Sequence, residues 1–348
     1  MDRMIWLKHY SIKDGRIFFL DELDTGISVP DGLEDEILKN GGISAGRFRH
    51  LIDGALFNRM VNEGIIVEKS GLSGRNETEG KRVVVLQPHC DDFALSCGAV
   101  LAKMRFEQNA QISIVNFFCK YSGEGFSFKD RIPLDDERYS GLRMEEDIAA
   151  AAYLEGKVDF LEGKYEDAYK RGKFIFYKDG FLKRDHRIFS AIEEDCRGVL
   201  EKYRPEALLI PSAIGWHVDH RIVHEAAIGA IAEYDKKLKE NLKVYLYEDY
   251  PYCDGKRDIY WGRLGELSTG LKLKPVYTDI TDFARHKARL INFYKSQSEM
   301  LDLNSFYAIN ETMRRLGSAT AIEGKIQKHD IPEEAELAER MWEVTGFA

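Results

Sequence analysis

Short alternating segments and one amphipathic helix mark the first 80 residues of the chain. Residues 9–13 and 16–20 are predicted to be strands, because the Asp-Gly dipeptide between them favours a two-residue hairpin turn. Between Phe48 and Val61, apolar side chains recur on one face of a helix. The polar, glycine-rich residues 69–81 predict a linker. We therefore expect a small N-terminal α+β accessory module of hairpin, helix and strand at residues 1–78.

From residue 82 onward, short hydrophobic strands alternate with longer helices. The predicted strands are 82–86, 111–118, 158–161, 206–210 and 243–247, and the predicted helices are 94–107, 141–154, 187–203 and about 220–239. Such alternation favours a mostly parallel sheet with helices on both faces, and right-handed crossovers make it a Rossmann-like, doubly wound α/β fold. We expect this domain to occupy residues 79–348 and to end in a C-terminal helical extension.

The composition is that of a globular protein. Of 348 residues, 44% are hydrophobic and 31% are charged, which argues against a disordered chain. Basic side chains number 50 against 59 acidic ones, a net charge of −9, and no block of lysine and arginine stands out. Binding to nucleic acid is therefore not expected. No apolar run approaches the roughly 20 residues of a membrane span, so no membrane partner is expected either.

The cysteines and the N-terminus indicate the compartment. The five cysteines include no Cys-x-x-Cys pair, so neither a disulfide framework nor a cysteine-rich zinc site is expected. The first residues of the chain carry too many charges for a secretory signal. We expect a cytoplasmic protein with a small-molecule partner, and the oligomeric state stays open.

Two polar clusters directly follow predicted strands. Pro-His-Cys-Asp-Asp at residues 88–92 follows the strand at 83–86, and His-Val-Asp-His at 217–220 comes after the strand at 208–210. In an open parallel sheet, ligands bind beyond the carboxyl ends of the strands. Taken singly, adjacent aspartates at a helix start are often only a helix cap, and lone histidines are often surface residues. Because both clusters stand at the same edge of the sheet, we interpret them together as one site.

The donor atoms in the two clusters are those of a catalytic metal site. Three ligands of imidazole nitrogen and carboxylate oxygen, with a position left for water, are typical of catalytic zinc. A further carboxylate would then serve as general base, and a further imidazole as acid, in metal-assisted hydrolysis. Zn²⁺ is the expected cofactor, although the same donors accept iron, manganese, cobalt or nickel.

Four segments, in order along the chain, resemble a known family. Residues 88–92 resemble the His-Pro-Asp-Asp signature of the PIG-L/LmbE-like metal-dependent N-acetylglucosaminyl deacetylases, and residues 217–221 resemble their His-x-Asp-His signature. The Arg-Met-Glu-Glu segment at 143–146 and the Tyr-Lys-Ser-Gln segment at 294–297 resemble two weaker helical motifs of that family. The resemblance extends over about residues 82–300.

The resemblance implies roles in metal binding and catalysis for five side chains. His89, Asp92 and His220 match the family's zinc ligands. Asp91 matches the general base, which takes a proton from metal-bound water. His217 matches the imidazole that lies beside the developing oxyanion and protonates the leaving amine. The implied reaction is hydrolytic removal of an N-acetyl group from an amino sugar or a sugar conjugate.

Further matches concern the substrate and the supporting residues. Ser96, Arg143 and Asp167 match family positions that contact the substrate sugar. Arg143 is also placed to form an ion pair with Glu146 on its own helix, and this alternative stays open. Asp219 is expected to orient one of the histidine rings rather than to bind the metal.

The chain departs from the family's pattern at several positions. Cys90 replaces the usual proline, Phe93 the usual glutamate, Ala99 a glycine and Tyr294 a histidine. None of these changes removes a metal ligand, but they leave the substrate undetermined. Because its neighbours already supply the ligands, we expect Cys90 to be a packed thiol rather than a metal ligand.

Three other functions are compatible with parts of the pattern. An amidase of the same fold would cleave a different amide, such as one in a specialised metabolite. The N-terminal module loosely resembles PqqD-like peptide-recognition domains, which suggests peptide binding by strand addition; the alternative is a unit that packs on the core or mediates oligomers. A nucleotide-binding oxidoreductase is disfavoured, because residues 88–92 stand where a glycine-rich phosphate loop belongs and their carboxylates would repel pyrophosphate.

Overall fold

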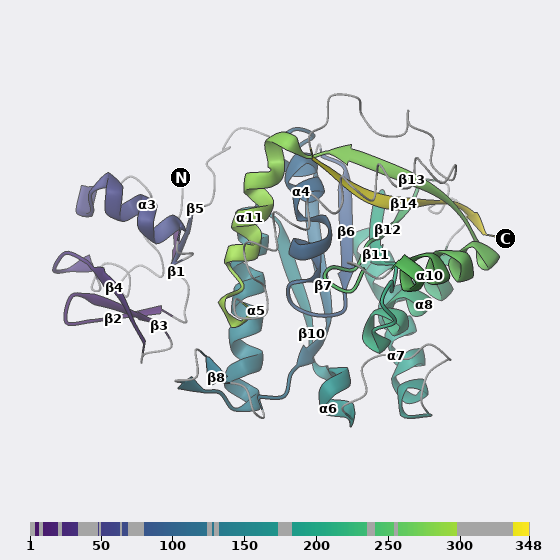
Figure 1. The fold of residues 1–348 in the computed structure, drawn as a ribbon, viewed down its shortest axis with the longest axis horizontal. Helices are drawn as coiled ribbons and strands as arrows, with labels where there is room; N and C mark the ends of the chain where they lie inside the picture. The colour runs from purple at the N-terminus through teal and green to yellow at the C-terminus, as the bar shows by residue number, and fades with distance from the viewer. Residues whose placement is uncertain are drawn as a thin grey trace.

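A seven-stranded sheet forms the centre of the computed structural model, with helices packed on both of its faces (Figure 1). Its strands lie side by side in the order β10 (Lys157–Glu166), β7 (Gln111–Lys120), β6 (Arg82–Gln87), β11 (Ala207–Pro211), β12 (Lys243–Tyr247), β14 (Ala338–Phe347) and β13 (Leu271–Asp279). The first five strands are parallel, whereas β14 runs antiparallel to both β12 and β13. The predicted α/β fold with a mostly parallel sheet is confirmed. The structure describes residues 4–6, 10–19, 23–33, 48, 50–62, 65–68, 80–123, 127–128, 132–172, 183–234, 241–253, 257–297 and 337–347.

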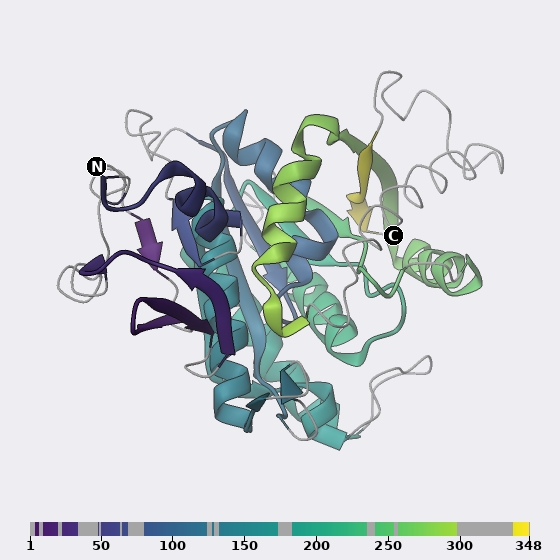
Figure 2. The same cartoon turned by 60° about the vertical axis from the view of Figure 1, so that its left-hand side comes forward.

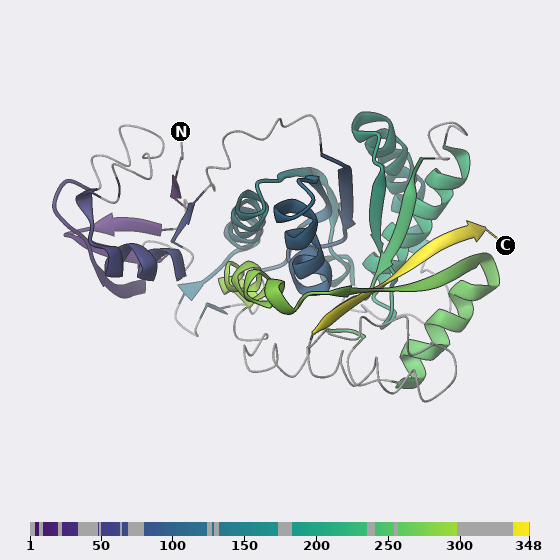
Figure 3. The same ribbon diagram turned by 90° about the horizontal axis from the view of Figure 1, so that it is seen from above.

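Two groups of helices cover the two faces of this sheet (Figure 3). One face carries α4 (Asp92–Phe106), α5 (Asp136–Tyr153) and α11 (Ala284–Asn292), and the other carries α7 (Lys183–Tyr203) and α8 (Val218–Glu233). The shorter or peripheral elements are β8 (Ser127–Phe128), β9 (Ile132–Pro133), α6 (Ala168–Gly172), α10 (Arg257–Gly270) and the 3-10 turns η1 (Thr281–Phe283) and η2 (Lys295–Gln297). Within the described part of the chain, every helix is too short or too polar to cross a lipid bilayer.

Strand β6 shows why the sequence forms a sheet covered on both faces. Successive side chains of a strand point to opposite faces, so a strand that is buried on both sides is hydrophobic throughout. Val83 and Val85 pack into the core beneath α4 and α5, while Val84 and Leu86 pack into the core beneath α7 and α8. The run of valines that predicted this strand is therefore explained by two separate hydrophobic cores.

The order of the strands places a switch point between β6 and β11. From β6 the chain moves outward to β7 and β10, and it then crosses back to β11 on the other side of β6. Helix α4 follows β6 on one face of the sheet, and α8 follows β11 on the other. Because the two connections leave in opposite directions, a crevice forms between them beyond the carboxyl ends of the strands. Ligands of doubly wound sheets bind in this crevice.

The sequence pattern did not anticipate the strands β13 and β14. They form an antiparallel pair that continues the sheet beyond β12, the last strand predicted from the sequence. Most of β13 is half-buried and contains Pro275, a residue that argues against a strand except at a sheet edge, which is where β13 lies. Of the predicted C-terminal helical extension, the described residues include α11, and residues 298–336 lie outside the described part.

Strand β14 supports the helix that begins at the candidate site. Helix α4 is interrupted at Cys97, whose backbone angles (φ −135°, ψ 20°) are not helical. The carboxylate of Glu339 accepts hydrogen bonds from the backbone N–H groups of Ala99 (3.4 Å) and Val100 (2.8 Å) just after this interruption. Lys287 forms a buried ion pair with the same carboxylate, at 2.5 Å. The C-terminal strand thus satisfies backbone donors that the interrupted helix leaves without partners.

The described residues of the N-terminal module form two small sheets and the helix α3. Strands β2 (Tyr10–Lys13), β3 (Arg16–Phe19) and β4 (Leu23–Ser28) form an antiparallel sheet, β1 (Met4–Trp6) pairs with β5 (Ile66–Glu68), and α3 spans Gly54–Asn62. The hairpin turn is the predicted one: Asp14 and Gly15 both have positive φ (49° and 67°), as a two-residue turn of this kind requires. Most of the predicted linker, residues 69–79, lies outside the described residues.

The module lies beside helix α5 (Figure 2). Its buried side chains, among them Ile17 and Ile66, belong to the same continuous hydrophobic cluster as the alanines of α5. Such packing is what an accessory unit requires, and peptide binding by the module stays a prediction.

Candidate metal centre

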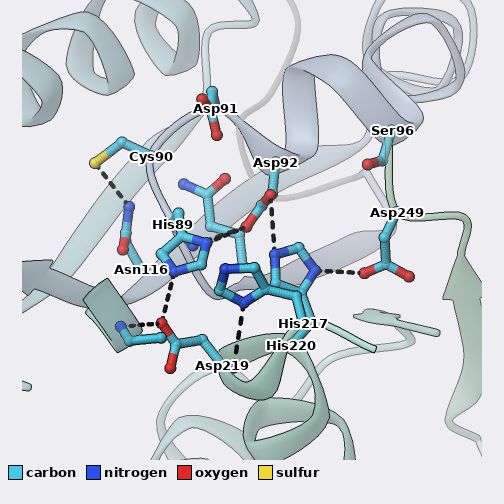
Figure 4. A network of polar contacts seen from close by, with 12 residues as sticks. His89, Cys90, Asp91, Asp92, Ser96, Asn116, His217, Asp219, His220 and Asp249 are labelled. Carbon is cyan, nitrogen blue, oxygen red and sulfur yellow. Dashed lines mark hydrogen bonds and ion pairs between the residues drawn. The ribbon is translucent and has the colours of Figure 1, made fainter. Parts of the chain in front are cut away.

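The two polar clusters meet at the switch point between β6 and β11. The chain leaves β6 through Pro88, presents His89, and enters α4 at Asp92. From β11 it passes through a short loop and enters α8, which presents His217 at its N-cap position and His220 in its first turn. Figure 4 shows the three imidazoles grouped beneath Asp92.

Three buried histidines form a cluster with the geometry of metal ligands. One ring nitrogen from each of His89, His217 and His220 lies within 4.8 Å of the other two. The ring centroids are 4.8 Å apart for His89 and His217, 4.9 Å for His217 and His220, and 5.3 Å for His89 and His220. Among the described residues, these three side chains are placed so that they could share a metal ion.

The carboxylate of Asp92 faces the same point. Its Oδ1 lies 3.4 Å from Nε2 of His220, and its Oδ2 lies 3.7 Å from Nδ1 of His89. Oδ2 also accepts a hydrogen bond of 2.7 Å from the backbone N–H of His89, which fixes the carboxylate. Nε2 of His220 is fully buried and has no hydrogen-bond partner. Because such an atom is costly to bury unpaired, the site fits a cation bound between His89, Asp92 and His220.

Two further carboxylates orient the rings of this cluster. Oδ2 of Asp219 lies 2.8 Å from Nε2 of His89, which leaves Nδ1 of that ring turned towards Asp92. Oδ1 of Asp249 lies 2.6 Å from Nδ1 of His220, which leaves Nε2 turned the same way. Carboxylates behind metal-binding histidines usually fix the ring in this manner. The contact of Asp219 is the one that its predicted role requires.

Asp249 is a residue that the sequence did not reveal. It follows β12, and its Oδ2 is held by the hydroxyl of Ser212 (2.5 Å) and by the N–H of Ile214 (3.1 Å). Only its position after a predicted strand could have indicated Asp249. Because β12 pairs with β11 in parallel, the residues that follow both strands lie at the same edge of the sheet.

The electrostatic environments of His217 and His220 shift their pKa values in opposite directions. Burial alone would lower the pKa of His220, but the negative charge of Asp92 and the hydrogen bond to Asp249 raise it to about 9. Burial and the nearby rings of His89 and His220 lower the pKa of His217 well below its usual value. The environment of His220 therefore favours a positive charge, which a metal cation would also supply.

Asp91 lies next to the cluster in a strained conformation. Its φ of 108° is in the left-handed region that residues with side chains rarely adopt, and such strain is common at functional sites. Its Oδ2 accepts a hydrogen bond of 2.8 Å from Arg143. Burial raises the pKa of Asp91 to about 7, although the charge of Arg143 opposes the shift. A carboxylate with a pKa near 7 is suited to act as a general base at neutral pH.

These contacts exclude one of the two interpretations of Arg143, the ion pair with Glu146, and its contact with a substrate stays a prediction. Its guanidinium is buried 4.2 Å from the ring centre of Tyr121, donates to the carbonyl of Cys90, and pairs with Asp91. Glu146 instead accepts hydrogen bonds from the N–H (2.8 Å) and the hydroxyl (2.5 Å) of Ser296. The ion pair of Arg143 is therefore with the site, and the proposed pairing with Glu146 is not what the structure contains.

The other two predicted substrate contacts occupy less central positions. Ser96 is buried, and its hydroxyl accepts a hydrogen bond of 3.2 Å from the N–H of Tyr250. Asp167 is half-buried, and it accepts a hydrogen bond of 2.8 Å from the N–H of Lys170 in the first turn of α6. Their contact with a substrate stays a prediction.

Comparison with known proteins places this geometry in a family. Residues 84–231 match the family model described as "PIG-L: GlcNAc-PI de-N-acetylase". These residues form a PIG-L deacetylase domain. The resemblance inferred from the sequence is thus confirmed, and with it the assignment to the hydrolases.

The chain is similar to individual deacetylases over most of their length. It is 27% identical over 218 residues to the 2'-N-acetylparomamine deacetylase of Streptomyces fradiae, a match that covers 63% of this chain and 74% of the relative. Its fold matches the crystal structure of the A40926 pseudoaglycone deacetylase Dbv21 with a TM-score of 0.58 and 25% identity, over 78% of this chain and 99% of that one. A deacetylase–teicoplanin complex matches with a TM-score of 0.58 and 22% identity, over 77% and 99%.

The structure accounts for the cysteine that replaces the family's usual proline. The backbone N–H of Cys90 donates a hydrogen bond of 2.8 Å to the hydroxyl of Tyr121, a bond that proline cannot make. The thiol is buried, and Asn116 donates to it at 2.9 Å. Burial, with the negative charge of Asp147 nearby, raises the pKa of this thiol well above its usual value. Cys90 therefore stays protonated at neutral pH, as expected of a packed thiol.

A glycine allows an aromatic ring to close over the histidines. The ring of Tyr252 lies 5.2 Å from that of His217 and 5.3 Å from that of His220. Gly215, with φ 96°, lies directly beside it, and a Cβ atom there would stand 2.4 Å from Cβ of Tyr252. Any other residue at this position would clash with Tyr252.

Replacing Asp249 by Asn is expected to weaken metal binding by about ten- to a hundredfold, because His220 loses the carboxylate that fixes its ring. The amide still reaches Ser212 and Ile214, so the fold should persist. Competition for Zn²⁺ against a chelator of known affinity measures the change. An affinity equal to that of the wild type would show that Asp249 does not orient the ligand.

Proposed function

We propose that this PIG-L protein is a zinc-dependent hydrolase that removes an N-acetyl group from an amino sugar or a sugar conjugate. The observation that carries the proposal is the buried group of His89, His217, His220 and Asp92 at the switch point, with Asp91 beside it. We assign the activity to the domain at residues 79–348, and an accessory role to the module at residues 1–78.

The proposed roles follow from where the donor atoms lie. His89, Asp92 and His220 would hold the metal through Nδ1, a carboxylate oxygen and Nε2, respectively. A bound Zn²⁺ supplies Lewis acidity and lowers the pKa of a water molecule towards about 7. Asp91, outside this ligand set and held by Arg143, accepts the proton of the attacking water.

His217 would serve the other half of the reaction. Its ring lies 4.8 Å from that of His89 and 4.9 Å from that of His220. A substrate carbonyl bound between the three rings would therefore lie beside His217. Because burial and the neighbouring imidazoles lower the pKa of His217, the ring is neutral at neutral pH, and it would take up the proton that the attacking water releases before it protonates the leaving nitrogen. The same imidazole can donate a hydrogen bond to the oxyanion.

The names of the relatives support an acylated sugar as substrate. The curated relative is named for N-acetylparomamine, and two structural relatives are named for the glycoconjugates A40926 pseudoaglycone and teicoplanin. We infer a small molecule that carries an acylated amino sugar as the partner of this chain. An amidase that cleaves another amide would use the same metal and base, so only the substrate separates the two functions.

A screen of N-acylated compounds distinguishes these functions. The metal-loaded protein is incubated with N-acetylated amino sugars, with sugar conjugates that carry longer acyl groups, and with acylated amines that lack a sugar. We expect acetate release from compounds with an N-acetylated amino sugar and none from the sugar-free amines. Cleavage confined to sugar-free amides would replace the proposed activity by the amidase.

A further inference from the structure

A fifth carboxylate, that of Asp147 on α5, binds the backbone of Asp91 and has no role in the proposed reaction. It is completely buried. Its Oδ1 accepts hydrogen bonds from the N–H of Asp91 (3.2 Å) and the hydroxyl of Tyr294 (2.6 Å). Its Oδ2 accepts hydrogen bonds from the side-chain amides of Gln87 (2.5 Å) and Asn116 (3.1 Å). Four donors, from residues 87–91, from β7 and from the residues after α11, therefore converge on one side chain.

The donors around Asp147 match the acceptor atoms of an ionised carboxylate. A carboxylate is an acceptor only, with about four lone-pair sites, and it can satisfy four donors at once. The amide of asparagine would turn an N–H group towards donors, and an apolar residue would leave all four donors buried without a partner. Each such donor costs free energy when it is left unsatisfied.

One of the four donors belongs to the strained backbone of Asp91. A residue with a side chain at φ 108° persists only where its surroundings fix it. Two side chains of α5 do so: Arg143 binds the carboxylate of Asp91, and Asp147, one helical turn further on, binds its N–H. Helix α5 thus holds both the side chain and the backbone of the proposed base.

We propose that Asp147 is a positioning residue that holds Asp91 in its left-handed conformation and so aims its carboxylate at the attacking water. This inference rests on the proposed function, in which Asp91 is the base. Gln87, Asn116 and Tyr294 fix Asp147 in turn, and they connect β6, β7 and the end of α11 to the site. Tyr294, which replaces the family's usual histidine, therefore supports the site through Asp147.

The variant Asp147→Asn tests the proposal against the matched control Glu146→Gln. The two acids are neighbours on α5 and are equally buried, but the carboxylate of Glu146 accepts its hydrogen bonds from Ser296, whereas that of Asp147 accepts one from Asp91. We expect Asp147→Asn to lower kcat by about a hundredfold, as misplacement of a catalytic group does, with KM changed less than about twofold and metal content unchanged. The control should lose much less of kcat. Equal losses of kcat in both variants would reduce Asp147 to a structural role and overturn the proposal.

A crystal structure of each variant gives a readout that does not depend on activity. We expect Asp91 to leave its left-handed conformation in Asp147→Asn and to keep it in Glu146→Gln. If the wild type releases no acetate, the proposed function fails, whereas this readout still decides whether Asp147 holds Asp91. An unchanged Asp91 backbone in Asp147→Asn would overturn the inference even if the deacetylase activity is established.

A second variant covers the case in which Asp147→Asn does not fold. Tyr294→Phe removes one of the donors to Oδ1 of Asp147 and leaves the charge in place. We expect it to lower kcat several-fold, with KM and metal content unchanged. In a crystal structure of the variant, the backbone of Asp91 should depart from its left-handed conformation or become less well ordered. A kcat and an Asp91 backbone identical to those of the wild type would contradict the proposal.

Discussion

Replacing Asp91 by Asn is expected to lower kcat by about a thousandfold while the protein keeps its fold and its metal. An amide cannot take a proton from water, and Asp91 lies outside the proposed ligand set of His89, Asp92 and His220. The amide oxygen can still accept the hydrogen bond from Arg143, so the local structure should change little. Steady-state acetate release gives kcat, and elemental analysis of the same sample gives the metal content.

The variant Asp159→Asn is a suitable control for this substitution. Asp159 lies on β10, where its carboxylate pairs with Lys202 at the protein surface. Like Asp91→Asn, this substitution removes one negative charge that faces a cationic side chain, but Asp159 lies outside the site. The control should therefore keep the kcat of the wild type. Asp91→Asn with the kcat of the wild type would exclude Asp91 as the base.

Replacing His220 by Ala is expected to abolish both metal binding and acetate release. His220 is completely buried between Asp92 and Asp249, with Nε2 directed to the proposed metal position. Its removal deletes a ligand and leaves two buried carboxylates without their partner. Breaking a buried pair of this kind costs about 3–5 kcal/mol, so the free energy of unfolding should fall as well.

His224→Ala separates these two effects. His224 is one helical turn further along α8 and is also buried, but its Nδ1 lies 2.7 Å from the carbonyl oxygen of Pro211 rather than towards the cluster. This variant should lose stability and still bind metal, as measured by thermal unfolding and by metal analysis of the purified protein. Stoichiometric metal in His220→Ala would rule out His220 as a ligand.

The sequence predicted those parts of the site that adjoin strongly hydrophobic strands. The valines of β6 and the apolar run of β11 identify two buried strands, and the polar residues that follow them, from His89 to Asp92 and from His217 to His220, lie together as expected. Local order along the chain was enough here, because parallel strands deliver their carboxyl ends to one edge of the sheet.

Residues whose roles depend on long-range packing could not be predicted in this way. Asp249 reaches His220 only because β12 pairs with β11 in a particular register. Arg143 has a carboxylate three residues further along its helix, yet the placement of α5 against the sheet directs it to Asp91. In the same way, nothing in the alanine-rich sequence of α5 indicates that Asp147 accepts hydrogen bonds from four donors on three segments of the chain.

The strands β13 and β14 were missed for a related reason. They pair with each other across residues 280–337, and β14 reaches the sheet through its pairing with β12. Strand β13 alternates only over its first four residues, and β14 buries four successive residues (339–342), two of them charged, so neither strand has the regular pattern that identifies a strand from sequence. Tertiary packing, rather than local pattern, decides their structure.

The most direct test of the metal-dependent deacetylase assignment is acetate release from an N-acetylated amino sugar conjugate before and after removal of the metal. The protein is stripped with a chelator, dialysed, and reloaded with increasing amounts of Zn²⁺, while intact fold is verified at each step. We expect the stripped protein to release no acetate, and the activity to return in proportion to the metal bound. Full acetate release by folded, metal-free protein would contradict the assignment.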